Sequence, residues 1–157
     1  MKRYAEGTTV PVERSRGELT GILTEHGCQR MAWATEPGAD TLMFELGGHQ
    51  YRFVISRPTL DDLRAMYRAD GRDWSRVQDP QGKVDAEWRR RWRAHVLLLK
   101  AKLEFVAGGD TTLEREFMPA LVVAGGRATL AEWLESEDGG RKLLLGEPAV
   151  ISTSANL

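Results

Sequence analysis

The chain has 157 residues, of which 41% are hydrophobic and 29% are charged, and its formal net charge is −1. This length fits a single domain that buries a core of its own without stabilising cross-links. The single cysteine, Cys28, excludes an intrachain disulfide, and no apolar run approaches the about 20 residues that a membrane-spanning helix needs.

Charge is distributed unevenly along the chain. Residues 52–102 contain thirteen basic and seven acidic groups, whereas residues 1–51 contain five and seven, and residues 103–157 contain four and nine. A basic segment between acidic flanks indicates either a surface for a polyanion or a set of internal ion pairs. The start of the sequence lacks the apolar run of a signal peptide, so we expect a cytoplasmic protein.

The first predicted element is a helix over residues 15–26. Residues 1–14 are polar, with scattered glycine, threonine and proline, and predict an extended arm. Ser15-Arg16-Gly17-Glu18 has the form of a capping box, in which the serine and glutamate side chains bond to the backbone at the helix start. Apolar residues follow at helical spacing as far as His26, and Gly27 is typical of a helix end.

Three β-strands are predicted next, over residues 29–35, 41–46 and 49–56. Apolar residues alternate along the second and third strands, which indicates one buried and one wetter face. Residues 36–40 predict a turn, and Gly47-Gly48 predicts a two-residue hairpin loop. We therefore expect an antiparallel meander.

Two helices of different length should follow. Thr59 is the predicted cap of a short helix over residues 59–68, and residues 69–83 predict a loop because they contain glycine, proline and alternating charges. Apolar residues then recur in two adjacent stripes over residues 84–107, which indicates a long helix covered on more than one side. We expect this helix to be the structural spine of the domain.

The C-terminal part predicts only short elements. These are a helix over residues 111–118, a strand over 121–123 and a helix that starts at the capping box Thr129–Glu132. The fold class is therefore α+β, with a helix, a three-stranded antiparallel meander, a short helix, a long central helix and short C-terminal helices. We divide the chain into an extended arm (1–14), a single α+β domain (15–136) and a loosely ordered tail (137–157).

The sequence contains no visible arrangement of catalytic or metal-binding residues. His26, His49 and His95 are far apart in sequence and none is next to a nucleophile, so structural or surface roles are favoured. His26 and Cys28 have no second ligand pair at the spacing of a zinc site. A glycine-rich phosphate-binding loop is also absent. We predict no catalytic residue, no metal and no cofactor.

The segment Glu87–Arg93 carries the pattern that most favours a function. On a helix, Arg89 and Arg93 share one face with Arg90 beside them, while two tryptophans lie on another face. Arginine and aromatic side chains together serve phosphate contact and base stacking. In the alternative interpretation both tryptophans belong to the core, and the arginines pair with acids of the C-terminal third or face solvent.

The preceding loop adds two arginines and a tryptophan. An exposed Trp74 in a basic loop would contact nucleic acid, whereas a buried Trp74 would hold the loop against the domain. Both interpretations stay open at this point. The predicted nucleic-acid-binding residues are Arg89, Arg90, Arg93, Arg72, Arg76 and Trp74.

The predicted order of a helix, three antiparallel strands and a basic helix resembles the double-stranded-RNA-binding domain, whose second helix meets phosphates. The chain departs from that family because residues 57–83 are inserted before the long helix, and because the helix does not start with lysines. The resemblance therefore concerns the order of the elements and transfers no function.

Three segments, Tyr4–Arg16, Arg91–Glu104 and Glu116-Phe117, resemble a family of small uncharacterised proteins from bacteriophages and prophages. This resemblance spans most of residues 3–136. It implies a phage accessory protein in the host cell cytoplasm. The family has no assigned activity, so the resemblance implies no functional residues.

Our leading hypothesis is a non-enzymatic accessory protein that binds DNA or RNA through the basic face of the long helix. The alternative is a protein-binding module that inhibits or adapts a host protein, and an enzyme with an unrecognised site is a third. The apolar surface of the long helix also favours a homo-oligomer such as a dimer, and no membrane partner is expected.

Overall fold

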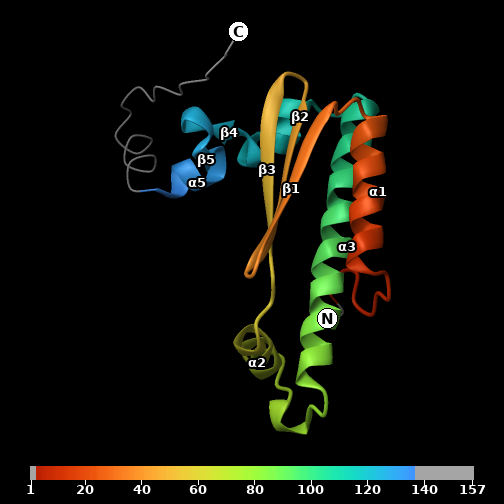
Figure 1. The fold of residues 1–157 in the computed structure, drawn as a ribbon, viewed down its shortest axis with the longest axis vertical. Coiled ribbons are helices and arrows are strands. Elements are labelled where there is room, and N and C mark those ends of the chain that lie inside the picture. The colour runs from red at the N-terminus through yellow and green to blue at the C-terminus, as the bar shows by residue number, and fades with distance from the viewer. Residues whose placement is uncertain (1–2, 137–157) are drawn as a thin grey trace. The chain divides into compact units, whose positions relative to one another are not determined.

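A computed structural model describes residues 3–136 of the chain (Figure 1). The elements follow the order of the predicted α+β fold. The described residues group into two compact units, each built from three separate stretches of the chain. The first unit contains residues 3–25, 35–40 and 55–101, and the second unit contains residues 26–34, 41–54 and 102–136. The predicted tail, residues 137–157, lies outside the described residues.

The predicted meander is present as a three-stranded sheet in the order β1-β2-β3. Its strands are β1 (Arg30–Glu36), β2 (Ala39–Leu46) and β3 (His49–Ser56). Strand β3 has the predicted bounds. The turn between β1 and β2 is shorter than predicted, because only residues 37 and 38 separate the two strands. Gly47 and Gly48 have φ angles of 61° and 78°, which confirms the hairpin that the glycine pair predicted.

Helix α1 (Val12–Glu25) begins three residues before its predicted start. The backbone N–H of Ser15 donates to the carbonyl of Pro11 over 3.1 Å, so the first helical hydrogen bond already spans this serine. Ser15 is fully buried inside the helix and is not its cap. The capping-box prediction was wrong here because a proline before the first turn supplies a preset φ for helix entry.

Within the predicted extended arm, residues 4–7 form a turn, residues 8–11 have no regular secondary structure and residues 12–14 belong to α1. The N–H of Glu6 donates to Arg3 and that of Thr8 donates to Ala5, over 3.1 and 3.3 Å. The Glu6 carboxylate also accepts a 2.9 Å hydrogen bond from the N–H of Arg3. These bonds fold the segment back on itself before α1 begins.

Thr59 caps α2 (Leu60–Ala69) as predicted, and Asp62 completes the capping box. The predicted loop is shorter than expected, because it contains the short 3-10 helix η1 (Trp74–Arg76) and because α3 (Pro80–Ala107) starts at Pro80. An Asp79 carboxylate oxygen accepts from the N–H of Gly82 over 2.8 Å, which stabilises this early start.

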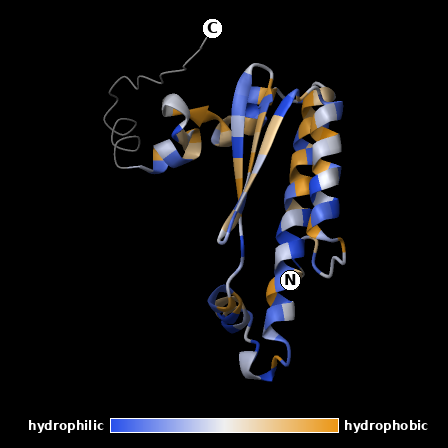
Figure 2. Cartoon of the chain, viewed as in Figure 1, coloured by the Kyte–Doolittle hydropathy of each residue, from blue (hydrophilic) through white to orange (hydrophobic). Residues whose placement is uncertain are grey.

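In the first unit, α1 lies side by side with the part of α3 that follows the first turns of α3 (Figure 1). Figure 2 shows apolar residues interspersed with hydrophilic ones along both helices, as expected of amphipathic helices that bury one face. Leu98, on the second predicted stripe, is 47% exposed, so this part of α3 is covered on one side only. The large buried side chains of this unit include Leu19, Leu23, Ile55, Trp88, Trp92, Val96 and Leu99.

The second unit has an aromatic core. Phe117 packs against Phe44, Tyr51 and Phe53, with ring centroids 5.5–6.1 Å apart. Thr129 caps the last helix through the predicted box with Glu132. The C-terminal elements of this unit are α4 (Leu113–Phe117), η2 (Met118–Ala120), β4 (Val122–Val123), η3 (Ala124–Gly126), β5 (Ala128–Thr129) and α5 (Leu130–Glu135).

Candidate functional site

Arg90, one of the predicted nucleic-acid contacts, is held by a carboxylate of its own helix. Its Nε donates to Oε2 of Glu87 and its Nη2 donates to Oε1, both over 2.9 Å. Its Nη1 donates to the backbone carbonyl of Tyr4 over 3.1 Å. Three donors of this guanidinium are therefore used inside the first unit.

Glu87 is a buried acceptor for two further arginines. Only 5% of the residue is exposed, and it also pairs with Arg3 over 3.3 Å and with Arg91 over 3.4 Å. Burial raises the pKa of Glu87, but hydrogen bonds and charges from Arg90, Arg3 and Arg91 outweigh burial and lower it overall. This cluster ties the N-terminal turn to α3, which is a structural role.

Arg93 is paired across two helices. Its Nη1 donates to the Glu18 carboxylate of α1. The alternative interpretation of the sequence expected acidic partners from the C-terminal third, yet Glu18 and Glu87 supply them from the first unit. The pair holds α1 against α3. A phosphate that binds Arg93 must compete with the Glu18 carboxylate, which weakens its binding.

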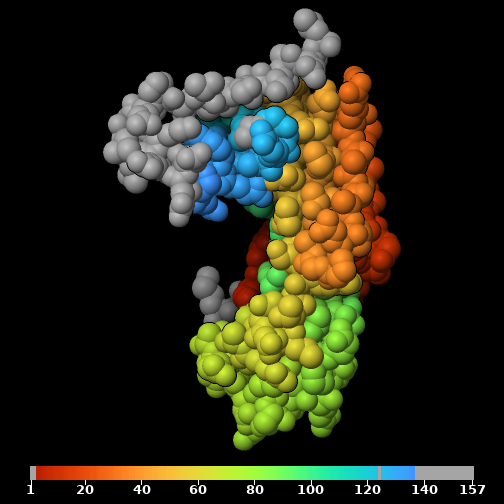
Figure 3. All heavy atoms as spheres, turned by 60° about the vertical axis from the view of Figure 1, so that its left-hand side comes forward, coloured from red at the N-terminus to blue at the C-terminus, as the bar shows by residue number. Residues whose placement is uncertain are grey.

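The loop residues form a small surface cluster. The Arg72 guanidinium lies 4.0 Å from the centroid of the Tyr67 ring, and Trp74 meets the same ring edge-on at 4.9 Å. Arg72 also pairs with Asp70 over 2.6 Å and Arg76 with Asp73 over 3.3 Å. Trp74 therefore has an aromatic companion that holds the loop. In Figure 3, the stretch from α2 to the start of α3 forms a continuous surface in yellow and green.

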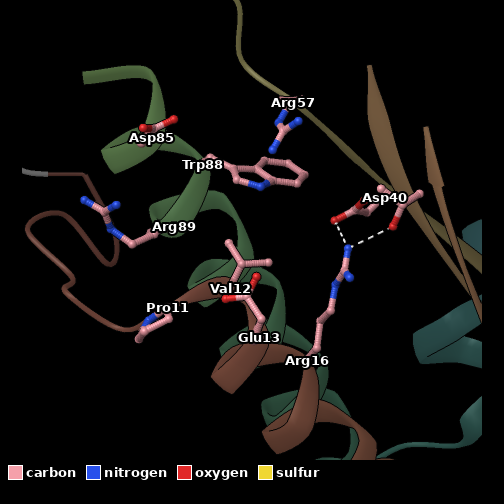
Figure 4. Close-up of a pocket in the computed structure, with 10 residues that line it drawn as sticks. Pro11, Val12, Glu13, Arg16, Asp40, Arg57, Asp85, Trp88 and Arg89 are labelled. Atoms are coloured by element: carbon pink, nitrogen blue, oxygen red, sulfur yellow. Dashed lines mark hydrogen bonds and ion pairs between the residues drawn. The ribbon is translucent and has the colours of Figure 1, made fainter. Parts of the chain in front are cut away.

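A pocket of about 390 Å³ opens in the first unit (Figure 4). It combines the start of α1, the turn ends of β1 and β2, the segment after β3 and the first turns of α3. This volume falls in the usual range for small-ligand sites, about 300–1,000 Å³. Its lining residues are Pro11, Val12, Glu13, Arg16, Thr35, Asp40, Arg57, Asp85, Trp88 and Arg89.

On one side of the pocket, the opposite charges of Arg16 and Asp40 form an ion pair. Arg16 donates to the carboxylate of Asp40 and, over 3.1 Å, to the hydroxyl of Thr35 (Figure 4). Asp40 is 2% exposed and also accepts from Nε1 of Trp92 over 3.2 Å. Arg16 and Asp40 thus neutralise each other's charge and build the wall of the pocket.

Arg57 and Arg89 are different, because neither forms an ion pair with a carboxylate within residues 3–136. The Arg57 guanidinium lies over the buried ring of Trp88, 5.3 Å from its centroid. Its backbone N–H donates to the carbonyl of Gly38 over 2.8 Å, which fixes the segment after β3. Nε of Arg89 is buried without a hydrogen-bond acceptor in the described part of the chain.

Of the six residues that the sequence predicted, the structure brings only Arg89 into this pocket. Sequence reasoning missed Arg57 and Arg16. Arg57 follows a strand and precedes the capped start of α2, so no local pattern distinguishes it from other surface arginines. Its place above Trp88 depends on packing between segments about 30 residues apart in sequence.

No group of three or more histidine, cysteine or acidic side chains in residues 3–136 is arranged to hold a metal ion. Within the same residues, no helix is long and apolar enough to cross a membrane. No protein-family model, curated protein or solved structure matches the chain. The pocket and its two arginines are therefore the features on which a functional proposal rests.

Proposed function

We propose that the chain is a non-enzymatic accessory protein that binds nucleic acid through its first unit, with Arg57 and Arg89 as the phosphate contacts. The observation that carries this proposal is the pair of arginines without carboxylate partners, within residues 3–136, around one pocket. An arginine that has no internal partner keeps its charge and its donors for a ligand. The resemblance to phage and prophage proteins is compatible with such a role.

Arg90, Arg93, Arg72 and Arg76 contribute less in this proposal than in the sequence-based hypothesis. Each already donates to a carboxylate of the first unit. A phosphate must compete with that carboxylate, so the gain in free energy on binding is smaller. With about two phosphates contacted on a single strand, the logarithm of the affinity should fall with the logarithm of salt at a slope of about −1.4.

The experiment measures the fluorescence anisotropy of a short labelled single strand at about 50 mM and about 200 mM salt. The Arg57→Glu/Arg89→Glu variant should lose binding. The matched control is Arg72→Glu/Arg76→Glu, which changes the net charge equally at exposed arginines outside the pocket and should retain most of the affinity. Equal loss in both variants would show a nonspecific charge effect, and no binding by the wild type at the lower salt would refute the proposal.

An exposed apolar residue favours the second candidate function, a protein-binding module. Leu98 on α3 is 47% exposed, and Ala101, one turn further along, is exposed as well. Leu98 and Ala101 lie on one face of α3, and burial of that face against a second protein chain would remove its apolar surface from water. Leu98→Lys should leave nucleic-acid binding unchanged but abolish self-association or capture of a host protein, which light scattering and pull-down would detect.

A further inference from the structure

Strand β1 (Arg30–Glu36) is an edge of the three-stranded sheet, because the strand order is β1-β2-β3. The opposite edge is partly covered, since Tyr51 of β3 forms an antiparallel bridge with Leu121. Within residues 3–136, no such bridge lies along the outer side of β1. An uncovered strand edge is a template on which a further strand can pair.

The hairpin geometry decides which backbone groups of β1 point outward. Only two residues form the turn to β2, so the residues that flank the turn face each other as a hydrogen-bonded pair. The same register places Arg30 opposite Glu45, and their side chains meet over 3.8 Å. Because hydrogen-bonded pairs alternate along the strands, the N–H and C=O groups of Met31 and Thr35 point away from β2. In the described part of the chain, these groups have no backbone partner in another segment.

The side chains of β1 favour a new strand. Natural edge strands are commonly protected by a proline, a lysine or a bulge. The middle of β1 is instead Ala32-Trp33-Ala34, in which both alanines are exposed. Charged residues occur only at the two ends, with Arg30 at the first position and Glu36 at the last. These charges have opposite signs, which makes the strand complementary to an antiparallel copy of itself.

From this self-complementary edge we infer that β1 pairs antiparallel with β1 of a second copy of the chain. The pair is centred on residue 33, so Arg30 of each copy lies opposite Glu36 of the other. The same register places Met31 opposite Thr35, the two positions whose backbone groups point outward, and these residues form hydrogen-bonded pairs. The two sheets then become continuous. The inference needs no nucleic acid, so it does not depend on the proposed function.

Pairing of two copies breaks no strong ion pair. The side chain of Arg30 is 84% exposed, and its contact with Glu45 is long. Glu36 has no ion pair within residues 3–136. In the dimer, each Arg30 lies between Glu45 of its own copy and Glu36 of the other copy, so both charged ends of the strand gain a partner.

Analytical ultracentrifugation tests the pairing by an exchange of charges. The wild type should form a dimer whose population rises with protein concentration. Arg30→Glu and Glu36→Arg each place like charges opposite one another at both ends of the pair, so each should weaken the dimer about tenfold. An equimolar mixture of these two variants should form a heterodimer about as stable as the wild-type dimer, because opposite charges meet again at both ends. Arg68→Glu, the same charge change at an exposed position of α2, should dimerise as the wild type does.

Amide hydrogen exchange locates the interface. The N–H groups of Met31 and Thr35 should exchange more slowly as the protein concentration rises. A monomeric wild type at its highest soluble concentration would overturn the inference, and so would a mixture that associates no better than its two components. Undiminished dimerisation of both single variants would also overturn it and would assign self-association to another surface, such as that around Leu98. Because heterodimer formation requires two folded chains, the mixture also controls for misfolding of either variant.

Discussion

Glu87 and Arg90 form a two-point ion pair within one turn of α3, with two N–O distances of 2.9 Å. The parallel arrangement of both hydrogen bonds matches the geometry in which arginine binds carboxylates most strongly. Arg89, the preceding residue on the helix, has no such partner within residues 3–136. Adjacent arginines of one cluster therefore differ, because a carboxylate neutralises Arg90 and none within residues 3–136 pairs with Arg89.

Glu87→Gln should reduce the free energy of unfolding at neutral pH by about 3 kcal/mol, because three arginines lose their buried counter-charge. The folded pKa of Glu87 is lowered below 4.5, so its contribution is complete above that pH and is lost as the pH falls through the folded pKa. Urea unfolding at pH 7 and in acid measures both effects. An unchanged acid dependence in the variant would contradict this assignment.

Arg90→Gln and Arg89→Gln form a matched pair that separates structure from binding. Arg90→Gln should destabilise the fold by about 1.5–3 kcal/mol, the usual contribution of hydrogen bonds to charged groups. Arg89→Gln should change the stability by less than about 0.5 kcal/mol, because no ion pair is lost. Denaturant midpoints decide between these outcomes, and a comparable loss in both variants would show that Arg89 is also structural.

His95 should make the fold sensitive to mildly acidic pH. Burial lowers its pKa below 6.5, the hydrogen bond from Nδ1–H to the Arg91 carbonyl opposes this, and the charges of Arg90 and Arg91 lower it further. The unfolded chain therefore takes up a proton below pH 6.5 before the folded chain does, and stability declines as the pH falls. In the His95→Gln variant, the melting temperature should change less between about pH 7.5 and pH 5.5 than in the wild type. The same pH dependence in both proteins would refute this role.

The two hairpin glycines should differ in their tolerance of a methyl group. At Gly47, φ is 61° and an added Cβ would lie 2.6 Å from Cδ2 of Leu113, whereas at Gly48 φ is 78° and no heavy atom lies within 4 Å. Gly48→Ala should cost about 1 kcal/mol from the backbone alone. Gly47→Ala should cost more because Leu113 must also move. Thermal unfolding of both variants tests the order, and equal losses would mean that Leu113 adjusts freely.

Short-range patterns predicted much of the local structure correctly. The cap at Thr59, the capping box at Thr129 and the bounds of β3 need only residues a few positions apart, so the sequence contains all the groups involved. The box at Ser15 failed although it has the same form. There, Pro11 started the helix earlier and placed Ser15 in the interior, an outcome that depends on packing as well as on spacing.

The arginines mark the limit between what sequence determined and what tertiary structure decided. Glu87 and Arg90 are three positions apart on a helix, so their pairing follows from helical geometry alone. Arg93 and Glu18 are 75 residues apart, and Arg57 reaches Trp88 from a different segment, so these contacts exist only once α1, α3 and the end of β3 have packed. The sequence alone thus determined where positive charge is concentrated. Only packing decided which of those charges are neutralised, because an ion pair depends on distances that separate parts of the chain acquire on folding.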